Sequence, residues 1–214
     1  MGKRRNHRER NRCEACQLHP TLCLCAEIRV LPVRTRVVVL MHQREIFKSS
    51  GTGRLAARAL QDGAVLVRGE RDSRLDGSDV LHPQRQALVL YPDENAAVLT
   101  PEYVARDGRP VTLVVPDGTW RQARKVMWRE PWLLDVPRVC LPAGAPSSYG
   151  LRHTPYPERT CTLEAIARAL EILEGPSVRV ELERLLGILV ERTRFARGVL
   201  EPDAAQAVMR SLAE

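Results

Sequence analysis

Four cysteines lie close together near the N-terminus of the chain. Cys13, Cys16, Cys23 and Cys25 are spaced C-x2-C-x6-C-x-C. The first pair has the spacing at which two thiolates in a tight turn reach one metal ion, and the second pair is near enough to converge on it. Four thiolates favour tetrahedral Zn²⁺. The spacing therefore predicts a structural zinc site with no open coordination position, in which His19 is a weaker alternative ligand.

A carboxylate follows an apolar run in the middle of the chain. Residues 111–115 are VTLVV, and Pro116, Asp117, Gly118, Thr119 and Trp120 come next. In open α/β sheets, ligands bind beyond the carboxyl ends of the strands, so Asp117 is well placed for chemistry. An aspartate before a helix is also an ordinary N-cap. The residues alone leave both interpretations open.

The elements that must position these residues alternate along the chain. Apolar runs predict strands at residues 37–41, 64–67, 86–91, 111–115 and 138–141. Helical spacing predicts helices at 52–61, 119–129, 162–173 and 180–199, with a short one from Pro202, and Gly175 and Pro176 are expected to separate the two long helices. The pattern indicates an α/β fold with a mainly parallel sheet and helices on both faces. Residues 142–160 should form a long loop, and such loops are often functional.

Composition and charge limit the possible partners. The chain has 214 residues, with 33 Lys and Arg against 26 Asp and Glu, and a net charge of +7. This balance favours a polyanionic partner, nucleic acid first, although Arg can also be abundant for compositional reasons. Residues 1–12 are basic and lack apolar periodicity, so we expect either an arm that contacts RNA phosphates or a solvated tail. No secretory signal or membrane span is evident, which favours a cytoplasmic protein, and in that compartment the cysteines argue against disulfides.

Several motifs together resemble the DTW-domain family. Asp117, Gly118, Thr119 and Trp120 resemble its D-x-T-W signature, and the N-terminal cysteines resemble its knuckle. Other segments match in order from about residue 13 to residue 174. These are His42 and Glu45 (H-x-x-E), Thr52 and Arg54 (T-x-R), Leu90, Tyr91 and Pro92 (L-Y-P), Tyr149, Leu151 and Arg152 (Y-x-L-R), and Thr162, Glu164 and Ala165 (S-T-x-E-A). Cys161 departs from the family's usual Ser, which would cap a helix better.

The resemblance implies a fold and an activity. Family members of this kind transfer the aminocarboxypropyl group of S-adenosylmethionine to a uridine in tRNA, and they are related to the SPOUT class. We therefore expect a SPOUT-like C-terminal knot, with S-adenosylmethionine as co-substrate and tRNA as partner. The expected organisation is a basic arm at 1–12, a zinc knuckle at 13–30 and a catalytic domain at 31–214. The oligomeric state stays open, with a monomer favoured.

The resemblance also assigns candidate roles. The catalytic candidates are Asp117, Thr119 and Trp120, with Asp117 either removing the proton of uridine N3 or accepting a hydrogen bond from it. Trp120 would stack on a base or fill the core behind Asp117. The donor's carboxylate needs a fork of hydrogen-bond donors, for which Arg152 and Arg54 are candidates. The cofactor-binding candidates are Leu90, Tyr91, Pro92, Gly118, Leu151, Arg152, Thr162, Glu164 and Arg54.

Two other functions fit the same residues. A methyltransferase on this fold would use the same donor and a similar pocket, but it would transfer the methyl group. A zinc-dependent RNA-binding module without catalysis would need the knuckle and the basic charge, but it would have no use for Asp117.

Overall fold

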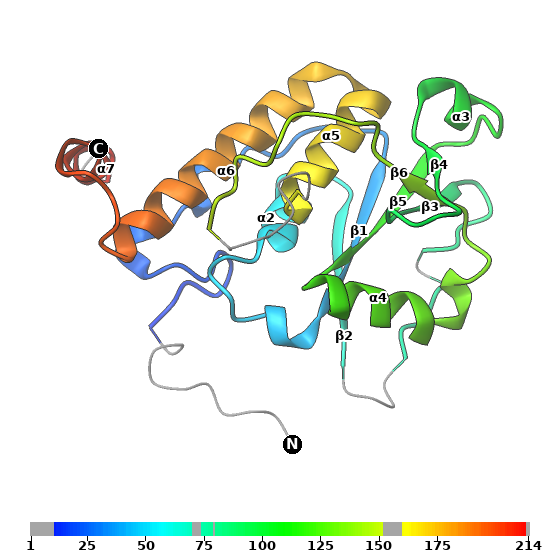
Figure 1. Cartoon of the computed structure of the whole chain (residues 1–214), viewed down its shortest axis with the longest axis horizontal. Coiled ribbons are helices and arrows are strands. Elements are labelled where there is room, and N and C mark those ends of the chain that lie inside the picture. Colours follow the sequence, from blue (N-terminus) through cyan, green and yellow to red (C-terminus); the bar gives the residue numbers. More distant parts are fainter. Residues whose placement is uncertain (1–10, 70–73, 79, 152–159, 213–214) are drawn as a thin grey trace.

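Six parallel strands form the centre of the protein. The computed structural model describes residues 11–69, 74–78, 80–151 and 160–212. Among these the strands are β1 (Arg36–His42), β2 (Gly63–Arg68), β3 (Gln86–Leu90), β4 (Ala97–Val98), β5 (Val111–Asp117) and β6 (Arg138–Cys140). Their order in the sheet is β2-β1-β5-β3-β6-β4, and every neighbouring pair is parallel (Figure 1). The mainly parallel sheet predicted from the sequence is confirmed.

Strands β1 and β5 lie side by side at the middle of the sheet. Their β-branched residues are buried on both faces, as expected for a strand covered by helices on each side. Met41 pairs with Asp117 in the register, so the last residues of both strands reach the same edge. That edge carries the residues that the sequence singled out for chemistry.

Helices cover the sheet on two sides. On one face lie α2 (Thr52–Arg58), α5 (Thr162–Glu174) and α6 (Pro176–Ala196), and they share a core with Val37, Val39 and Met41 of β1. On the other face, Val126 and Met127 of α4 (Trp120–Arg129) pack against Val38, Leu40 and Val114. Figure 1 shows α4 across the sheet from α5 and α6. The alternation of buried β1 residues between two cores is the period of two that a strand imposes.

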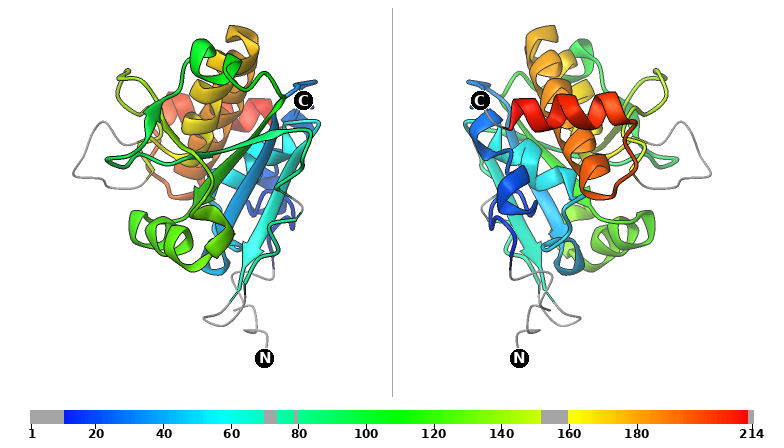
Figure 2. Two further views of the ribbon diagram at one scale, coloured as in Figure 1. Left: turned by 90° about the vertical axis from the view of Figure 1, so that its right-hand side faces the viewer. Right: turned by 90° about the vertical axis from the view of Figure 1, so that its left-hand side faces the viewer.

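Shorter elements complete the fold. Two further helices are α3 (Pro101–Ala105) and α7 (Pro202–Ser211), and α7 crosses the end of α6 (Figure 2). Four 3-10 turns are η1 (Pro20–Leu22), η2 (Cys25–Glu27), η3 (Gln43–Glu45) and η4 (Pro131–Leu133). No helix of the described part of the chain has the length and apolar character needed to cross a membrane.

The N-terminal cysteine segment is packed into the larger core. Leu18, Leu22 and Leu24 are buried together with residues of α2 and α6, and Figure 2 shows this segment beside α2. Arg192 of α6, 4% exposed, donates a hydrogen bond of 2.6 Å to the carbonyl of Cys23 and another to Glu27. The cysteine segment is therefore continuous with the core of the catalytic domain predicted for residues 31–214.

Several predicted boundaries need correction. The predicted break between the long helices is confirmed at Gly175, but α6 begins at Pro176 rather than at residue 180. Proline is tolerated there because its missing N–H costs no helical hydrogen bond. Strand β5 continues through Pro116 to Asp117. The sequence analysis missed β4 and α3, which are too short for a periodic signal. The C-terminal knot stays a prediction, because residues 152–159 lie outside the described residues. Most of the basic arm at 1–12 also lies outside them.

Candidate active site at the carboxyl edge of the sheet

Asp117 ends β5 and lies beneath the surface at the carboxyl edge. Its side chain is 5% exposed. The N-cap of α4 is Thr119, two residues later, whose side chain accepts a hydrogen bond from the backbone N–H of Gln122. Asp117 is therefore not the helix cap, and the interpretation that made it an ordinary N-cap is wrong. Its carboxylate is left for contacts across the fold.

One of these contacts joins β5 to α5. Thr162, the first residue of α5, donates a hydrogen bond of 2.5 Å from its hydroxyl to Asp117 Oδ1. Thr52 at the start of α2 accepts a hydrogen bond of 3.3 Å from the backbone N–H of Leu163. The first turns of α2 and α5 thus meet beside Asp117.

Gly53 gives the carboxylate its space. A Cβ atom at Gly53 would lie 2.9 Å from Asp117 Cγ and Oδ2, and 2.9 Å from Val39 Cγ1. Atoms of real side chains do not approach this closely without movement of their neighbours. Glycine is therefore required at this position of α2 for Asp117 to lie against the helix.

The turn between β5 and α4 is tightly closed. Gly118 has a φ of +151°, and a Cβ there would lie 3.0 Å from Gln122 Oε1. Gln122 also accepts a hydrogen bond of 2.7 Å from Thr119 N, which completes a capping box. Its Nε2 lies 3.3 Å from Nδ1 of His42, the last residue of β1. The end of β1 and the start of α4 are thereby connected.

His42 is held as an acceptor. The backbone N–H of Arg44 donates to His42 Nδ1 at 3.1 Å. Burial, and next the nearby charge of Arg44, lower the pKa of His42. The lowered pKa keeps the imidazole neutral near neutral pH, the form in which Nδ1 can accept these hydrogen bonds. Glu45 itself is buried and pairs with Lys48 at 2.5 Å.

The aromatic residues of the edge lie on the outside of the turn. Trp120 is 41% exposed, and its ring centroid lies 6.4 Å from that of Tyr91. Leu90 is buried at the end of β3, and the N–H of Tyr91 donates to the carbonyl of Val139. Because Trp120 is substantially exposed, its interpretation as core filling behind Asp117 is wrong.

Arg54 turns back toward the loop that follows β1. Its Nη2 donates to the carbonyls of Glu45, at 3.3 Å, and Ile46. Burial lowers the pKa of Arg54, while the negative charge of Asp117 acts in the opposite direction. The guanidinium is thus a positive charge near Asp117, and its role toward a donor carboxylate stays a prediction.

Glu164 holds the loop after β6. Its carboxylate is buried and accepts hydrogen bonds from Ser147 Oγ (2.6 Å), Ser148 N (2.7 Å) and Cys161 N (2.8 Å). Burial by itself would raise the pKa of Glu164, but these hydrogen bonds outweigh it and keep the pKa below the ordinary value. Glu164 therefore works as an anion that fixes the backbone of the loop.

Tyr149 connects the same loop to the other side of the site. Its hydroxyl donates a hydrogen bond of 2.5 Å to the carbonyl of Ser50, just before α2. Leu151 is buried in the core, and its carbonyl accepts from Arg197. Arg152 lies outside the described residues, and its predicted contact with the donor stays a prediction.

Two cavities accompany this arrangement, and neither is lined by Asp117. The larger, about 540 Å³, lies at the amino edge of the sheet, near Gln86 and Pro137. The smaller, about 10 Å³, lies between Cys16, Gly51 and Arg54. The large cavity lies at the opposite edge of the sheet from Asp117 and the other candidate catalytic residues. Its size alone therefore does not make it the active site. Asp117 is thus almost fully buried and is not part of either cavity.

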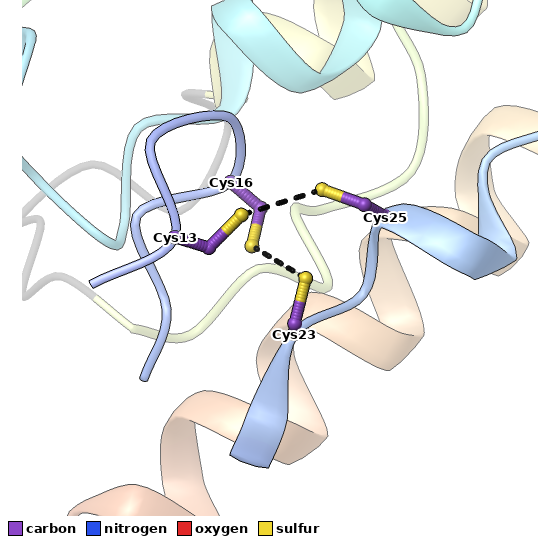
Figure 3. A group of neighbouring side chains, drawn as sticks. All are labelled: Cys13, Cys16, Cys23 and Cys25. Carbon is purple, nitrogen blue, oxygen red and sulfur yellow. Dashed lines mark hydrogen bonds between the residues drawn. The ribbon is translucent and has the colours of Figure 1, made fainter. Parts of the chain in front are cut away.

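The four N-terminal cysteines meet in space. Their sulfur atoms all lie within 4.8 Å of one another (Figure 3). Cys13 Sγ lies 3.6 Å from Cys25 Sγ, and Cys16 Sγ lies 3.8 Å from Cys23 Sγ. Tetrahedral zinc with Zn–S bonds of about 2.3 Å places its ligands about 3.8 Å apart, so these separations fit a metal. This group of cysteines could hold a metal ion.

Backbone N–H groups stabilise the thiolate of Cys13 and oppose the effect of burial at Cys16. The N–H of Cys16 is the main reason why the pKa of Cys13 falls to about 6. Burial raises the pKa of Cys16, and N–H groups of Leu18 and Leu24 oppose it. An N–H directed at sulfur stabilises a thiolate, the form that binds metals. The donor set suits the metal site predicted from the cysteine spacing.

Comparison with known proteins identifies the family of this chain. The family model described as the DTW domain matches residues 10–194. The chain belongs to the DTW-domain family. It is 30% identical over 209 residues to tRNA-uridine aminocarboxypropyltransferase 2 of Drosophila melanogaster, covering 94% of this chain and 82% of that protein. No solved structure gives a significant match.

Two mammalian relatives are also similar. Proteins with the same name from Macaca fascicularis and Mus musculus are 30% and 29% identical, over 78% of this chain. This chain spans 58% of the length of each. The resemblance to the DTW-domain family inferred from short motifs is thus confirmed over nearly the whole chain.

The DTW domain brings together three of the residues chosen from sequence. Asp117, Thr162 and Arg54 lie near one another at the carboxyl edge, while Thr119 and Trp120 lie on the outer side of the turn. Gly53 was missed, and its position between two motif residues, Thr52 and Arg54, was the available signal. Ser147 and Ser148 were also missed, because only the fold shows that they bind Glu164.

Proposed function

We propose that the protein transfers the 3-amino-3-carboxypropyl group of S-adenosylmethionine to N3 of a uridine in tRNA, releasing methylthioadenosine. The observation that carries the proposal is the convergence of separate family motifs on Asp117. Thr162 binds its carboxylate and Gly53 lies against it, at the carboxyl edge of a parallel sheet where ligands of such folds bind. Similarity to three proteins named for this activity supports the same assignment.

The reaction must select one of three activated carbons on the sulfonium of the donor. N3 loses its proton and attacks the γ-carbon of the aminocarboxypropyl arm, a C–N bond forms, and the C–S bond breaks with its electron pair going to sulfur. Attack on the methyl carbon would give methylation instead. Orientation therefore decides the product, and the protein's main task is to hold donor and uridine in line.

Asp117 is the group that we assign to the N3 proton. In the described structure its Oδ1 accepts from the hydroxyl of Thr162, which fixes the carboxylate in one orientation. A carboxylate so oriented can remove the N3 proton or hold it in a hydrogen bond. Movement of the residues that cover Asp117 must accompany binding, because the side chain is only 5% exposed.

The donor's own carboxylate requires a cation. Arg54 is a fixed positive charge near Asp117, held by the carbonyls of Glu45 and Ile46. We assign it, together with Arg152, to the donor carboxylate, since a guanidinium binds carboxylates through two parallel hydrogen bonds. We assign Leu90, Tyr91, Pro92, Gly118, Leu151 and Glu164 to the walls and supports of the donor pocket.

We assign zinc to the N-terminal cysteines, with a structural role. Cys13, Cys16, Cys23 and Cys25 supply four ligands, which leaves no position for a reacting water. The metal would fix the turn that Arg192 attaches to α6 through Cys23. The protein would work on tRNA in the cytoplasm.

The test is mass spectrometry of nucleosides from tRNA incubated with the protein and S-adenosylmethionine. We expect uridine to gain the mass of the aminocarboxypropyl group while methylthioadenosine accumulates. A methyl gain with adenosylhomocysteine would instead identify a methyltransferase. RNA binding without either product, unchanged in Asp117→Asn, would identify a binding module. Either of these two results would overturn the proposal.

A further inference from the structure

The outer face of α4 carries exposed aromatic and basic side chains. Trp120 is 41% exposed and Trp128 is 68% exposed. Arg124 lies between them at helical spacing, and Arg121 and Lys125 lie on the neighbouring positions, all three exposed. The opposite face of α4 buries Ala123, Val126 and Met127 against the sheet. The exposed stripe is therefore not needed to hold the helix in place.

Trp128 is the unusual member of this stripe. Its exposed fraction is larger than that of any other exposed large apolar side chain in the described part of the chain. Single exposed aliphatic residues are common on protein surfaces, but an indole is mostly buried unless it has a partner outside the chain. Exposure of this size, beside cations, points to a ligand with a flat apolar face and negative charge.

The cations of the stripe have no acidic partner. Within the described residues, Arg121, Arg124 and Lys125 take part in none of the salt bridges and side-chain hydrogen bonds, whereas most other arginines of the fold do. Three uncompensated charges next to two exposed indoles are complementary to a polyanion whose charges alternate with aromatic rings. Unpaired RNA has this composition, since its phosphates alternate with bases that offer a free face.

We propose that the outer face of α4 binds an unpaired stretch of tRNA that adjoins the target uridine, with Trp128 stacking on a base and Arg124 and Lys125 contacting phosphates. The inference rests on the proposed function for the identity of the polyanion. The inference adds to that function a surface that holds the tRNA outside the reacting centre. A paired stem does not fit, because stacking on its own neighbours hides the base faces that Trp128 would need.

The position of the stripe agrees with this assignment. Helix α4 begins at Trp120, directly after the Asp117–Thr119 turn, and Trp128 lies eight residues further along. At 1.5 Å per residue the two indoles are about 12 Å apart along the helix. A base on Trp128 is thus a neighbour of the target rather than the target itself, and its contact should affect binding more than the chemical step.

The first experiment measures binding of fluorescently labelled bulk tRNA by anisotropy, without S-adenosylmethionine. Trp128→Ala should weaken binding roughly 5- to 150-fold, the range for loss of one base–aromatic stack. Trp128→Phe should stay close to wild type because it keeps an aromatic face. Trp128→Leu should resemble Trp128→Ala, since it keeps apolar area but cannot stack. Unchanged binding in Trp128→Ala, or full binding in Trp128→Leu, overturns the proposal.

The charges are tested by salt dependence. The double variant Arg124→Gln/Lys125→Gln should lower the slope of log affinity against log salt concentration by about 1 to 2. Arg210→Gln, on the exposed face of α7, is the control outside α4 and should leave the slope unchanged. A decrease in this variant half as large as that of the double variant, in proportion to the one charge removed, would show that only net charge matters and would overturn the proposal. Melting temperatures close to wild type should accompany all variants, because the substituted side chains are exposed.

The remaining experiments distinguish unpaired RNA from other partners that could bind the outer face of α4. A short oligouridylate should compete with tRNA, whereas an RNA duplex of the same length should not; the reverse order overturns the proposal. If Trp128→Ala instead changes a dimer into a monomer in sedimentation, a second copy of the chain is the occupant. Failure of the proposed function is distinguishable, because tRNA binding that depends on Trp128 can be measured even if no product forms.

Discussion

The hydroxyl of Thr162 donates a hydrogen bond of 2.5 Å to Asp117 Oδ1 and so joins the first residue of α5 to the last residue of β5. The two residues are 45 positions apart and belong to different motifs of the family. Their contact brings the two motifs together at the carboxyl edge of the sheet. It fixes the orientation of the carboxylate before any substrate is present.

Asp117→Asn should abolish most of the activity without unfolding the protein. The asparagine Oδ1 can still accept from Thr162, so the melting temperature should change little. Product formation should fall roughly 100- to 10,000-fold, the range for loss of a positioned acid–base group. The rate of methylthioadenosine release checks this, and a variant as active as wild type would remove Asp117 from the chemistry.

Thr162→Val should cost about 1–3 kcal/mol of unfolding free energy, because it leaves the buried carboxylate of Asp117 without this hydrogen bond.

Gly53→Ala should destabilise the protein although alanine is the better helix former. The added Cβ would lie 2.9 Å from the Asp117 carboxylate, and overpacking of this kind costs about 1–3 kcal/mol. Gly187→Ala in α6 is the matched control, because its Cβ would have no neighbour within 4 Å. That variant should be stabilised by about 0.5–1 kcal/mol. Urea titrations measure both, and a shift of the same sign in the two variants would contradict the close contact.

The contribution of Glu164 to stability should depend on pH. Burial opposes its charge, but the hydrogen bonds from Ser147, Ser148 and Cys161 lower its pKa in the folded state. A lowered folded pKa means that this stabilisation is fully present above the ordinary glutamate pKa of about 4.3 and is lost as the pH falls through the lower folded value. Relative to Glu164→Gln, wild type should be more stable by about 1.5–3 kcal/mol at neutral pH.

The same comparison should change under acid conditions. The difference in unfolding free energy between wild type and Glu164→Gln should shrink as the pH is lowered below about 4. Denaturant titrations at a series of pH values measure it. A difference that grows with acid would mean that Glu164 is protonated in the native loop.

Removal of metal should loosen the cysteine segment and the end of α6 together. Zinc should be present at one ion per chain, and a chelator should lower the melting temperature, as should Cys16→Ser. The physical reason is that Arg192, buried in α6, binds the carbonyl of Cys23. Elemental analysis and thermal melts check this. Full stability of protein shown to be free of metal would mean that the thiols need no ion.

Cys161→Ser should stabilise the start of α5. Cys161 is the N-cap, and Glu164 already accepts a hydrogen bond from its backbone N–H. A serine hydroxyl accepts from the first turn better than sulfur, for a gain of about 0.5–1 kcal/mol. The thiol should also resist alkylation at neutral pH, because burial, and next the charge of Glu164, raise its pKa to about 12. Thermal melts and labelling rates measure the two effects.

The sheet was predictable because strands buried on both faces have a distinctive sequence pattern. The β-branched residues of β1 and β5 form continuous apolar runs that only covered strands tolerate. The short β4 and α3 contain no such runs. The start of α6 was predicted at residue 180 rather than at Pro176, since proline can both end a helix and begin one.

The sequence predicted which residues belong to the candidate site better than it predicted the contacts between them. The resemblance to the DTW-domain motifs identified Asp117, Thr162 and Arg54 as candidates, but the pairing of Thr162 with Asp117 depends on how α5 folds back over β5. Gly53 lies between the motif residues Thr52 and Arg54, but only the fold shows that a Cβ atom there would meet Asp117. The exposure of Trp120 likewise follows from the direction in which α4 leaves the sheet.

The segment between η3 and α2 is held by bonds to its main chain. Arg12 donates to the carbonyl of Phe47, Arg54 to that of Ile46, and Tyr149 to that of Ser50. A carbonyl is the same in every amino acid, so these three bonds survive any exchange of side chains at those positions. Substitution of Ile46, Phe47 or Ser50 should therefore leave the backbone path of this segment in place.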